Sequence, residues 1–221
     1  MSRWVIFFTG VIIAGAPAAF ALNAVKVFPR SKGSTWHYRY STGGSYTLTV
    51  ISSSHQHFTE KQTGTVHATI QYRRTADGWV SGDGGHHHSL QVQPQKLTVS
   101  ITHSSGVLIP KSSLWKPGYK WLSSTKDTRH VTMHRVMILV KSTITRVSKI
   151  TGMKQVIVPA GKFNCYRVRT IEHITTRVTV GNISRVKHAK TKIIDYYAKG
   201  VGLVERDADH NRIELIRYHI P

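Results

Sequence analysis

Apolar and polar residues alternate with a period of two along most of the chain, and this pattern constrains the fold more than any other feature. Trp36, Tyr38 and Tyr40 alternate with polar residues, and residues 66–72 repeat the pattern. Such alternation is typical of half-buried β-strands. An amphipathic helix of about twelve residues or more is not indicated anywhere, and short helices are expected at most in residues 52–62 and 112–116.

The number of alternating segments predicts the fold class. Roughly eight to eleven strands fit in the chain, joined by turns such as Gly181-Asn182. In residues 128–147 the apolar phase changes, which predicts a long strand with a bulge or a bend near His134 and Arg135. A sheet of this size must curl or close. We therefore expect an all-β protein with one large, curved antiparallel sheet, forming a half-barrel or an open barrel.

The N-terminal residues have the three parts of a secretory signal peptide. Arg3 supplies a positive charge, residues 4–15 are almost entirely apolar, and Ala19-Phe20-Ala21 fits a cleavage site. The apolar run is shorter than the roughly 20 residues needed to span a bilayer. We expect residues 1–21 to be a signal peptide and residues 22–221 to form a single β-rich domain, with a seam near residues 110–118. The protein is then exported, and periplasmic, wall-associated or extracellular.

Cysteine usage limits how such an exported domain is stabilised. Cys165 is the only cysteine, so an intramolecular disulfide cannot form. The domain must then be stabilised by its core and by strand pairing. Because Cys165 lies in an alternating apolar segment, we interpret it as a small buried hydrophobic residue and not as a reactive thiol.

Positive charge is in large excess. The chain has 31 Lys and Arg against 10 Asp and Glu, a net charge of +21, with 14 His in addition. Such a field attracts polyanions, and for an exported protein these are anionic cell-wall polymers or an anionic membrane surface. Export disfavours nucleic acid as the partner. The alternative is a generally basic surface adapted to a habitat. The candidate polyanion-binding residues are Arg167, Arg169, Arg177, Arg185 and Lys187.

Three motifs resemble those of a known group of proteins. Residues 28–38 resemble an F-P-x-x-x-G-x-x-W-x-Y opening, residues 158–165 resemble V-P-A-G-x-F-x-C, and residues 196–204 resemble Y-Y-A-x-G-V-G-L-V. Together they look like a diffuse group of bacterial exported proteins of unknown function. The resemblance implies a sheet similar to the curved, open β-structures of periplasmic lipoprotein carriers. It carries no catalytic residue, because the motifs consist of turns and strand starts.

A glycine-rich segment supplies the one dense cluster of potential metal ligands. His86 and His88 would share one side of a strand and suit zinc or copper. A structural zinc site needs four ligands and no cysteine is near, so the alternative is a solvated polar loop. We found no nucleophile elbow, zinc-protease motif or P-loop. We therefore expect no enzyme activity, no catalytic residue and no cofactor.

Aromatic residues are the candidates for ligand binding. Trp36, Trp79, Trp121 and Tyr196 could line the inside of a curved sheet, and packing in the core is the alternative role. The sequence thus leaves three hypotheses. The first is an exported protein that binds a lipid-like or other apolar ligand in its concave side. The second is a basic protein that adheres to anionic cell-wall polymer or matrix, and the third is a weak metal binder. The sequence does not fix the oligomeric state.

Overall fold

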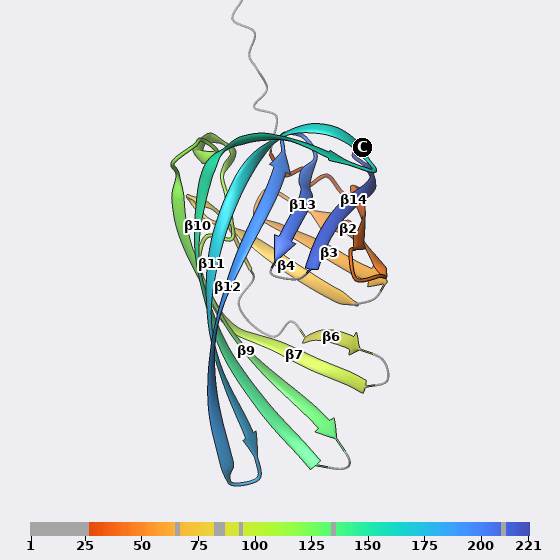
Figure 1. Ribbon diagram of the computed structural model, residues 1–221. Coiled ribbons are helices and arrows are strands. Elements are labelled where there is room, and N and C mark those ends of the chain that lie inside the picture. Colours follow the sequence, from red (N-terminus) through yellow and green to blue (C-terminus); the bar gives the residue numbers. More distant parts are fainter. Residues whose placement is uncertain (1–26, 65–66, 82–86, 93–94, 134–135, 209–210) are drawn as a thin grey trace, which may run out of the picture.

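A computed structural model describes residues 27–64, 67–81, 87–92, 95–133, 136–208 and 211–221 (Figure 1). The proposed signal peptide, residues 1–21, lies outside the described residues. Fourteen strands and one 3₁₀-helix make up the described chain. They are β1 (Thr35–Tyr40), β2 (Ser45–Ser53), β3 (His57–Gly64), β4 (Ala68–Arg74), β5 (Gly78–Ser81), β6 (His87–Val92), β7 (Gln95–Gly106), β8 (Ile109–Pro110), η1 (Ser112–Leu114), β9 (Lys120–Met133), β10 (Val136–Val158), β11 (Gly161–Val180), β12 (Ile183–Ala198), β13 (Gly202–Ala208) and β14 (Asn211–His219).

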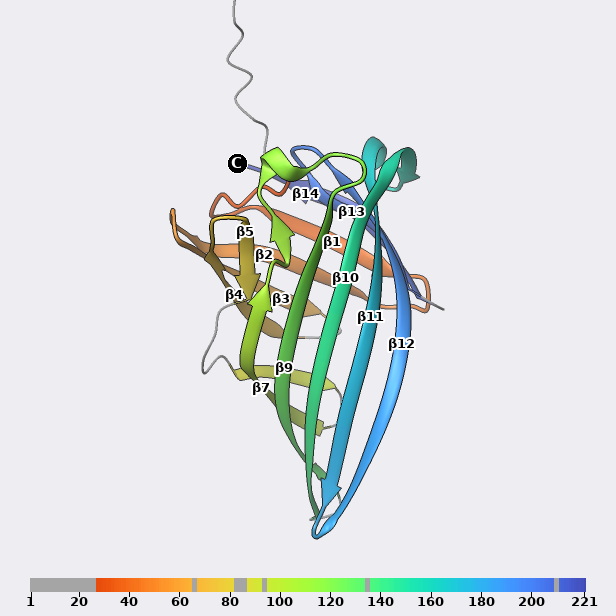
Figure 2. The same ribbon diagram turned by 90° about the vertical axis from the view of Figure 1, so that its left-hand side faces the viewer.

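All fourteen strands belong to one antiparallel sheet, in the order β6-β7-β9-β10-β11-β12-β13-β14-β1-β2-β3-β4-β5-β8. The sheet is strongly curved and, within the described residues, does not close into a barrel (Figures 1 and 2). The all-β, curved-sheet prediction is confirmed. In the described part of the chain, no helix has the length and apolar character needed to cross a membrane.

Two local predictions are confirmed and two are wrong. Gly181 has a φ of 54° and, with Asn182, forms the two-residue turn between β11 and β12. A short helix, η1, forms inside residues 112–116, where Trp115 is buried.

Residues 52–62 are not helical, because most of them pair as the end of β2 and the start of β3. Residues 128–147 are not one strand: β9 ends at Met133, and Val136 pairs with it at the start of β10. His134 and Arg135, the residues proposed for the bulge or bend, lie outside the described residues.

The end of the β10–β11 hairpin bends over the sheet. The register between these strands shifts between Ile150 and Gly152, and Gly152 has a φ of 153°, which favours glycine. Beyond this point the hairpin reaches β14, where the Ala160 amide donates a hydrogen bond of 3.1 Å to the Leu215 carbonyl (Figure 1). Val156, Val158 and Cys165 thereby join the main core cluster, and Cys165 is fully buried.

A short segment connects the two arms of the curved sheet. The Val107 amide donates to the Leu122 carbonyl in β9, and the Leu108 amide donates to the Trp79 carbonyl in β5, both at 2.9 Å. Residues 107 and 108 thus lie between β9 and β5 and hydrogen-bond to both strands. The concave side of the sheet is therefore enclosed where this segment crosses from one arm to the other.

Candidate functional site

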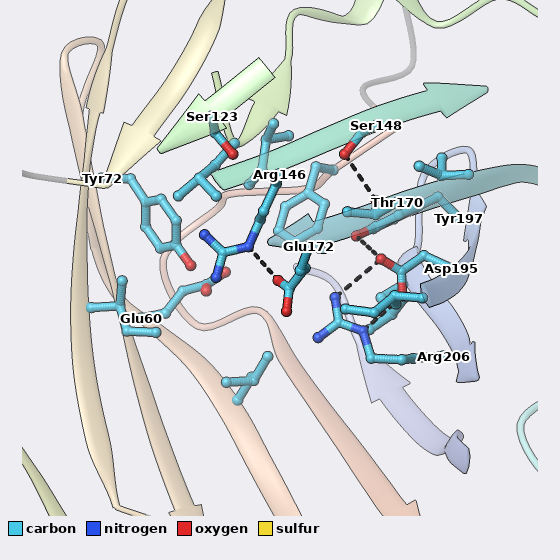
Figure 3. A pocket seen from close by; sticks show the side chains of 18 of the residues that line it. Glu60, Tyr72, Ser123, Arg146, Ser148, Thr170, Glu172, Asp195, Tyr197 and Arg206 are labelled. Carbon is cyan, nitrogen blue, oxygen red and sulfur yellow. Dashed lines mark hydrogen bonds and ion pairs between the residues drawn. The ribbon is translucent and has the colours of Figure 1, made fainter. Parts of the chain in front are cut away.

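A cavity of about 400 Å³ lies on the concave side of the sheet (Figure 3). Strands from both arms contribute to it, from β1–β4 on one side and from β9–β13 on the other. Its size falls in the range of small-molecule sites, roughly 300–1,000 Å³. The polar and charged residues that line it are Glu60, Gln62, Ser123, Arg146, Ser148, Thr170, Glu172, Asp195 and Arg206.

Two ion pairs sit on adjacent strands of the cavity wall. Arg146 Nε of β10 lies 2.5 Å from Glu172 Oε1 of β11, and Arg206 of β13 contacts both carboxylate oxygens of Asp195 of β12, at 2.7 and 3.1 Å. The Asp195 carboxylate raises the pKa of Arg206 well above its ordinary value. Paired in this way, the four charges compensate one another at the cavity wall.

Glu60 is the charged residue of the opposite wall. It is 3% exposed on β3, and its carboxyl group accepts a hydrogen bond from the Tyr72 hydroxyl of β4. Its second oxygen, Oε1, has no hydrogen-bond partner among the described residues. Burial raises the pKa of Glu60 to about 7. This carboxyl group can therefore change its protonation state near neutral pH and offers a free oxygen to a ligand (Figure 3).

Arg30 lies beside this wall and is held by aromatic rings. Its guanidinium carbon is 4.4 Å from the ring centroid of Trp79 and 5.3 Å from that of Phe58. Burial lowers the pKa of Arg30 to about 10, although the charge of Glu60 acts in the opposite direction. The cation–π contacts compensate part of the desolvation of this side chain.

Replacing Glu60 by glutamine is expected to change how stability depends on pH. The pKa of Glu60 in the folded protein, about 7, is above its ordinary value of 4.5. Its proton therefore stabilises the fold fully below pH ~4.5, and this contribution is lost as the pH rises through ~7. Relative to Glu60→Gln, the unfolding free energy of the native protein should fall by roughly 3 kcal/mol across this interval. Urea denaturation of both proteins at several pH values measures this, and parallel profiles would contradict it.

The rest of the cavity wall is apolar and aromatic. Leu48 and Ile70 line one side, and Val168, Ile193 and Trp121 line the other. The site therefore combines hydrophobic surface with a few charged groups at defined places. Such a surface suits an amphipathic molecule better than a purely polar or a purely apolar one.

Among the four aromatic residues predicted to bind a ligand, Trp121 lines the cavity. Trp36 is 1% exposed in the core, and its indole Nε1 donates to the Val201 carbonyl at 2.6 Å. Tyr196 is buried in the core with Lys154 over its ring, while its neighbour Tyr197 lines the cavity. Trp79 contacts Phe58 edge-on.

Trp79 borders a second cavity, of about 480 Å³, on a different part of the molecule. Four basic side chains line it, and eight of its other residues carry hydroxyl groups or have small side chains. The basic residues are Arg30, His55, Arg74 and Lys111. Arg74 and His55 already contact each other at 2.6 Å. The chemistry of this cavity suits a small anionic group.

The five predicted polyanion-binding residues do not gather in one place. Arg167 and Arg169 lie on β11 beside the core, where Arg167 donates to the Thr151 hydroxyl at 3.1 Å. Arg177, Arg185 and Lys187 lie in the distal half of the β11–β12 hairpin, where Arg177 pairs with Val186, the residue between Arg185 and Lys187.

The two predicted metal ligands belong to the start of β6 and the segment before it. His86 lies outside the described residues, and for His88 the structure describes the backbone alone, in β6 opposite Val99. Within the described ranges, three or more His, Cys, Asp or Glu side chains do not gather in a metal-binding arrangement.

Sequence reasoning missed the charged residues of the cavity. One local signal could have found one of them: Glu172 occupies the same strand phase as Val168 and Ile174, where an apolar residue is expected. Glu60 and Asp195 give no comparable signal, because their partners come from other strands.

The comparisons place the chain in a family. Residues 96–218, more than half of the chain, match the model of the DUF3108-like family, and the chain belongs to this family. No curated protein matches the chain.

One solved structure shows a related fold. The chain is similar to a Bacteroides fragilis protein that is described as exported and as having a YmcC-like fold. The TM-score is 0.51 and the identity is 13%, over 87% of this chain and 98% of that chain. A Parabacteroides distasonis protein described as a lipoprotein gives a TM-score of 0.49 and 10% identity, over 88% of this chain and 99% of that chain. The first of these similarities supports the curved-sheet architecture.

Proposed function

We propose that this member of the DUF3108-like family is an exported, non-enzymatic protein of the cell envelope that binds an amphipathic, lipid-like ligand in the cavity of its curved sheet. The observation that carries the proposal is the composition of the cavity wall. About 400 Å³ of space is bordered by aliphatic and aromatic side chains, with charged groups at two places.

The charges give the ligand an orientation. Within the Arg146–Glu172 pair and within the Asp195–Arg206 pair, each charge is compensated by its partner. An apolar chain can therefore lie beside these pairs without leaving a charge unpaired. Glu60 Oε1 is unpartnered among the described residues, so the polar end of the ligand belongs at Glu60 and Tyr72. The apolar portion then extends along Ile193 and Val168.

Binding is favoured over catalysis by the residue types present. The described residues that line the cavity include neither His nor Cys nor Lys. The hydroxyl groups of Ser148 and Thr170 bond to each other at 2.9 Å. Export is supported by the signal-peptide pattern of residues 1–21 and by the description of the similar Bacteroides fragilis protein.

Quenching of tryptophan fluorescence by a dibrominated stearic acid tests the proposal, at pH ~6, where Glu60 is mostly protonated and can donate a hydrogen bond to the carboxylate of the probe. Bromine quenches only nearby indoles, and Trp121 lines the cavity. We expect saturable quenching, and we expect Ser123→Phe, which fills the cavity, to weaken binding by roughly tenfold or more.

The control is Ser124→Phe, since Ser124 follows Ser123 on β9 and points to the other face of the sheet. It should bind as the native protein does. Thermal unfolding establishes that both variants are folded. Absence of quenching in the native protein, or equal binding by folded Ser123→Phe, would refute the proposed function.

A further inference from the structure

Strands β10, β11 and β12 continue well beyond the cavity and end in a projecting hairpin (Figures 1 and 2). We call residues 137–144, 174–180 and 183–191 of these strands the β-extension. The eight residue-to-residue steps from Glu172 at the cavity to Val180 at the turn span about 26 Å at roughly 3.3 Å per step. The turn at Gly181-Asn182 is thus remote from the core.

The two faces of the β-extension differ. Its inner face continues the face that lines the cavity, because side chains alternate and the register is unbroken from Arg146 and Glu172 outward. Aliphatic residues recur on this face, beginning with the paired Ile144 and Ile174 beside the cavity. At the far end the row consists of Ile138, Val180 and Ile183.

Large aliphatic side chains are exposed around the turn. Ile183 is 68% exposed, Val186 is 46% exposed and Val180 is 39% exposed, and Met137 at the start of β10 is 66% exposed. All residues of β12 from 183 to 190 are exposed, so neither face of the hairpin end is covered by the described chain. Val180 and Ile183 pair on the inner face, and Val186 and Met137 lie on the outer face, so the end of this projecting element exposes apolar groups on both faces, which is typical of an interaction site.

Basic side chains accompany this apolar end. Between Glu172 and Asp195 the sequence has five Lys or Arg residues and no acidic residue. The two flanking acids are themselves paired with Arg146 and Arg206 at the cavity. The cations lie on both faces of the hairpin, and they are Arg177, Arg185, Lys187, Lys190 and Lys192.

We propose that the end of the β-extension docks on the surface of an anionic lipid bilayer, with Val180 and Ile183 entering the headgroup region and the surrounding Arg and Lys side chains contacting lipid phosphates. A bilayer surface offers both negative charge and an apolar phase, which is the combination that this hairpin presents. An anionic polymer would engage the cations and leave the aliphatic residues in water. A second copy of the chain would bring like charges together.

The docking is shallow because of the backbone. The turn carries peptide groups that need water or headgroups as hydrogen-bond partners, so it stays out of the hydrocarbon layer. Docked in this way, the inner face connects the bilayer surface with the cavity. The docking itself does not depend on the ligand proposed for the cavity.

Co-sedimentation with vesicles tests the proposal, using phosphatidylglycerol vesicles and phosphatidylcholine vesicles at low and high salt. We expect binding to phosphatidylglycerol that weakens with salt, and little binding to phosphatidylcholine. The double variant Val180→Ser/Ile183→Ser should bind at least tenfold more weakly. The triple variant Arg177→Gln/Arg185→Gln/Lys187→Gln should also lose at least tenfold.

Matched control variants test whether the position of the removed side chains, and not only their apolar or charged character, determines vesicle binding. Ile157 is 69% exposed near the opposite end of β10, so Ile157→Ser removes a comparable apolar group away from the turn. Lys162→Gln/Lys199→Gln removes exposed charge elsewhere. Both should bind vesicles like the native protein. Ser123→Phe should also bind normally, which separates docking from occupation of the cavity.

The outcomes divide clearly. A loss confined to the turn variants, with thermal unfolding unchanged, supports the proposal. If the charge variants lose vesicle binding while Val180→Ser/Ile183→Ser retains it, the surface recognises anionic polymers in general and the bilayer proposal is overturned. Equal binding to both vesicle types, or no binding to either, also overturns it.

Discussion

Replacing Trp36 by alanine is expected to lower the free energy of unfolding by about 3–5 kcal/mol. Trp36 is 1% exposed in β1, which lies between β14 and β2. Its indole contacts Phe28 and donates a 2.6 Å hydrogen bond to the Val201 carbonyl, 165 residues further along the chain. The substitution removes a large core side chain and leaves a buried carbonyl without its donor. Urea denaturation measures the loss.

Trp36→Phe separates the two contributions. It keeps most of the ring and removes the N–H donor, so a smaller loss of about 1–2 kcal/mol is expected. Because Trp36 is not part of the cavity wall, the folded Trp36→Phe variant should bind the dibrominated fatty acid as the native protein does. Weakened ligand binding at unchanged stability would instead assign Trp36 to the ligand site.

Replacing Asp195 by alanine is expected to destabilise the protein by about 2–4 kcal/mol. The carboxylate is 6% exposed and accepts two hydrogen bonds from Arg206, at 2.7 and 3.1 Å. Without it, the Arg206 guanidinium remains at the cavity wall without a counter-charge. The side chain of Arg206 is 37% exposed, so hydration there reduces the loss below that of a fully buried pair. Chemical denaturation again gives the free energy.

Two further variants test whether the missing partner is the cause. Asp195→Leu/Arg206→Met removes both charges and should recover most of the stability lost in Asp195→Ala. Arg39→Ala breaks a 3.3 Å ion pair with Glu214 in which Arg39 is 56% exposed, so less than about 1 kcal/mol is expected. A double variant as unstable as Asp195→Ala would mean that packing, and not charge compensation, is the main role of this pair.

The strands were predictable where local patterns determine them. Alternation at Trp36, Tyr38 and Tyr40 and the turn at Gly181-Asn182 depend on neighbouring residues, and the structure agrees with both. The prediction of one strand over residues 128–147 is wrong because a bulge and a tight chain reversal both shift the apolar phase. The pairing of Met133 with Val136 distinguishes the chain reversal from the bulge. Which strands pair depends on the arrangement of the whole sheet and not on the residues near the turn.

The candidate site was less predictable than the fold. Tryptophans were natural candidates, yet Trp36 is used in the core and Trp121 alone of the four predicted residues lines the cavity. The charged residues come together because the sheet curves, which brings β3 and β4 opposite β10–β13. Glu60 and Arg146 are far apart in the sequence, and no local pattern predicts that they line the same cavity.

The length of β12 leaves part of one strand edge uncovered. Its partner β13 pairs with it from Ile193 to Ala198, so among the described residues no strand hydrogen-bonds to that edge over residues 183–192. An open edge of this kind is a template on which a foreign strand can add and from which aggregation can start. Lys187, Lys190 and Lys192 lie along it, and a row of like charges repels the same edge of a second molecule. The basic residues of β12 therefore also oppose edge-to-edge pairing between molecules along this long, exposed strand.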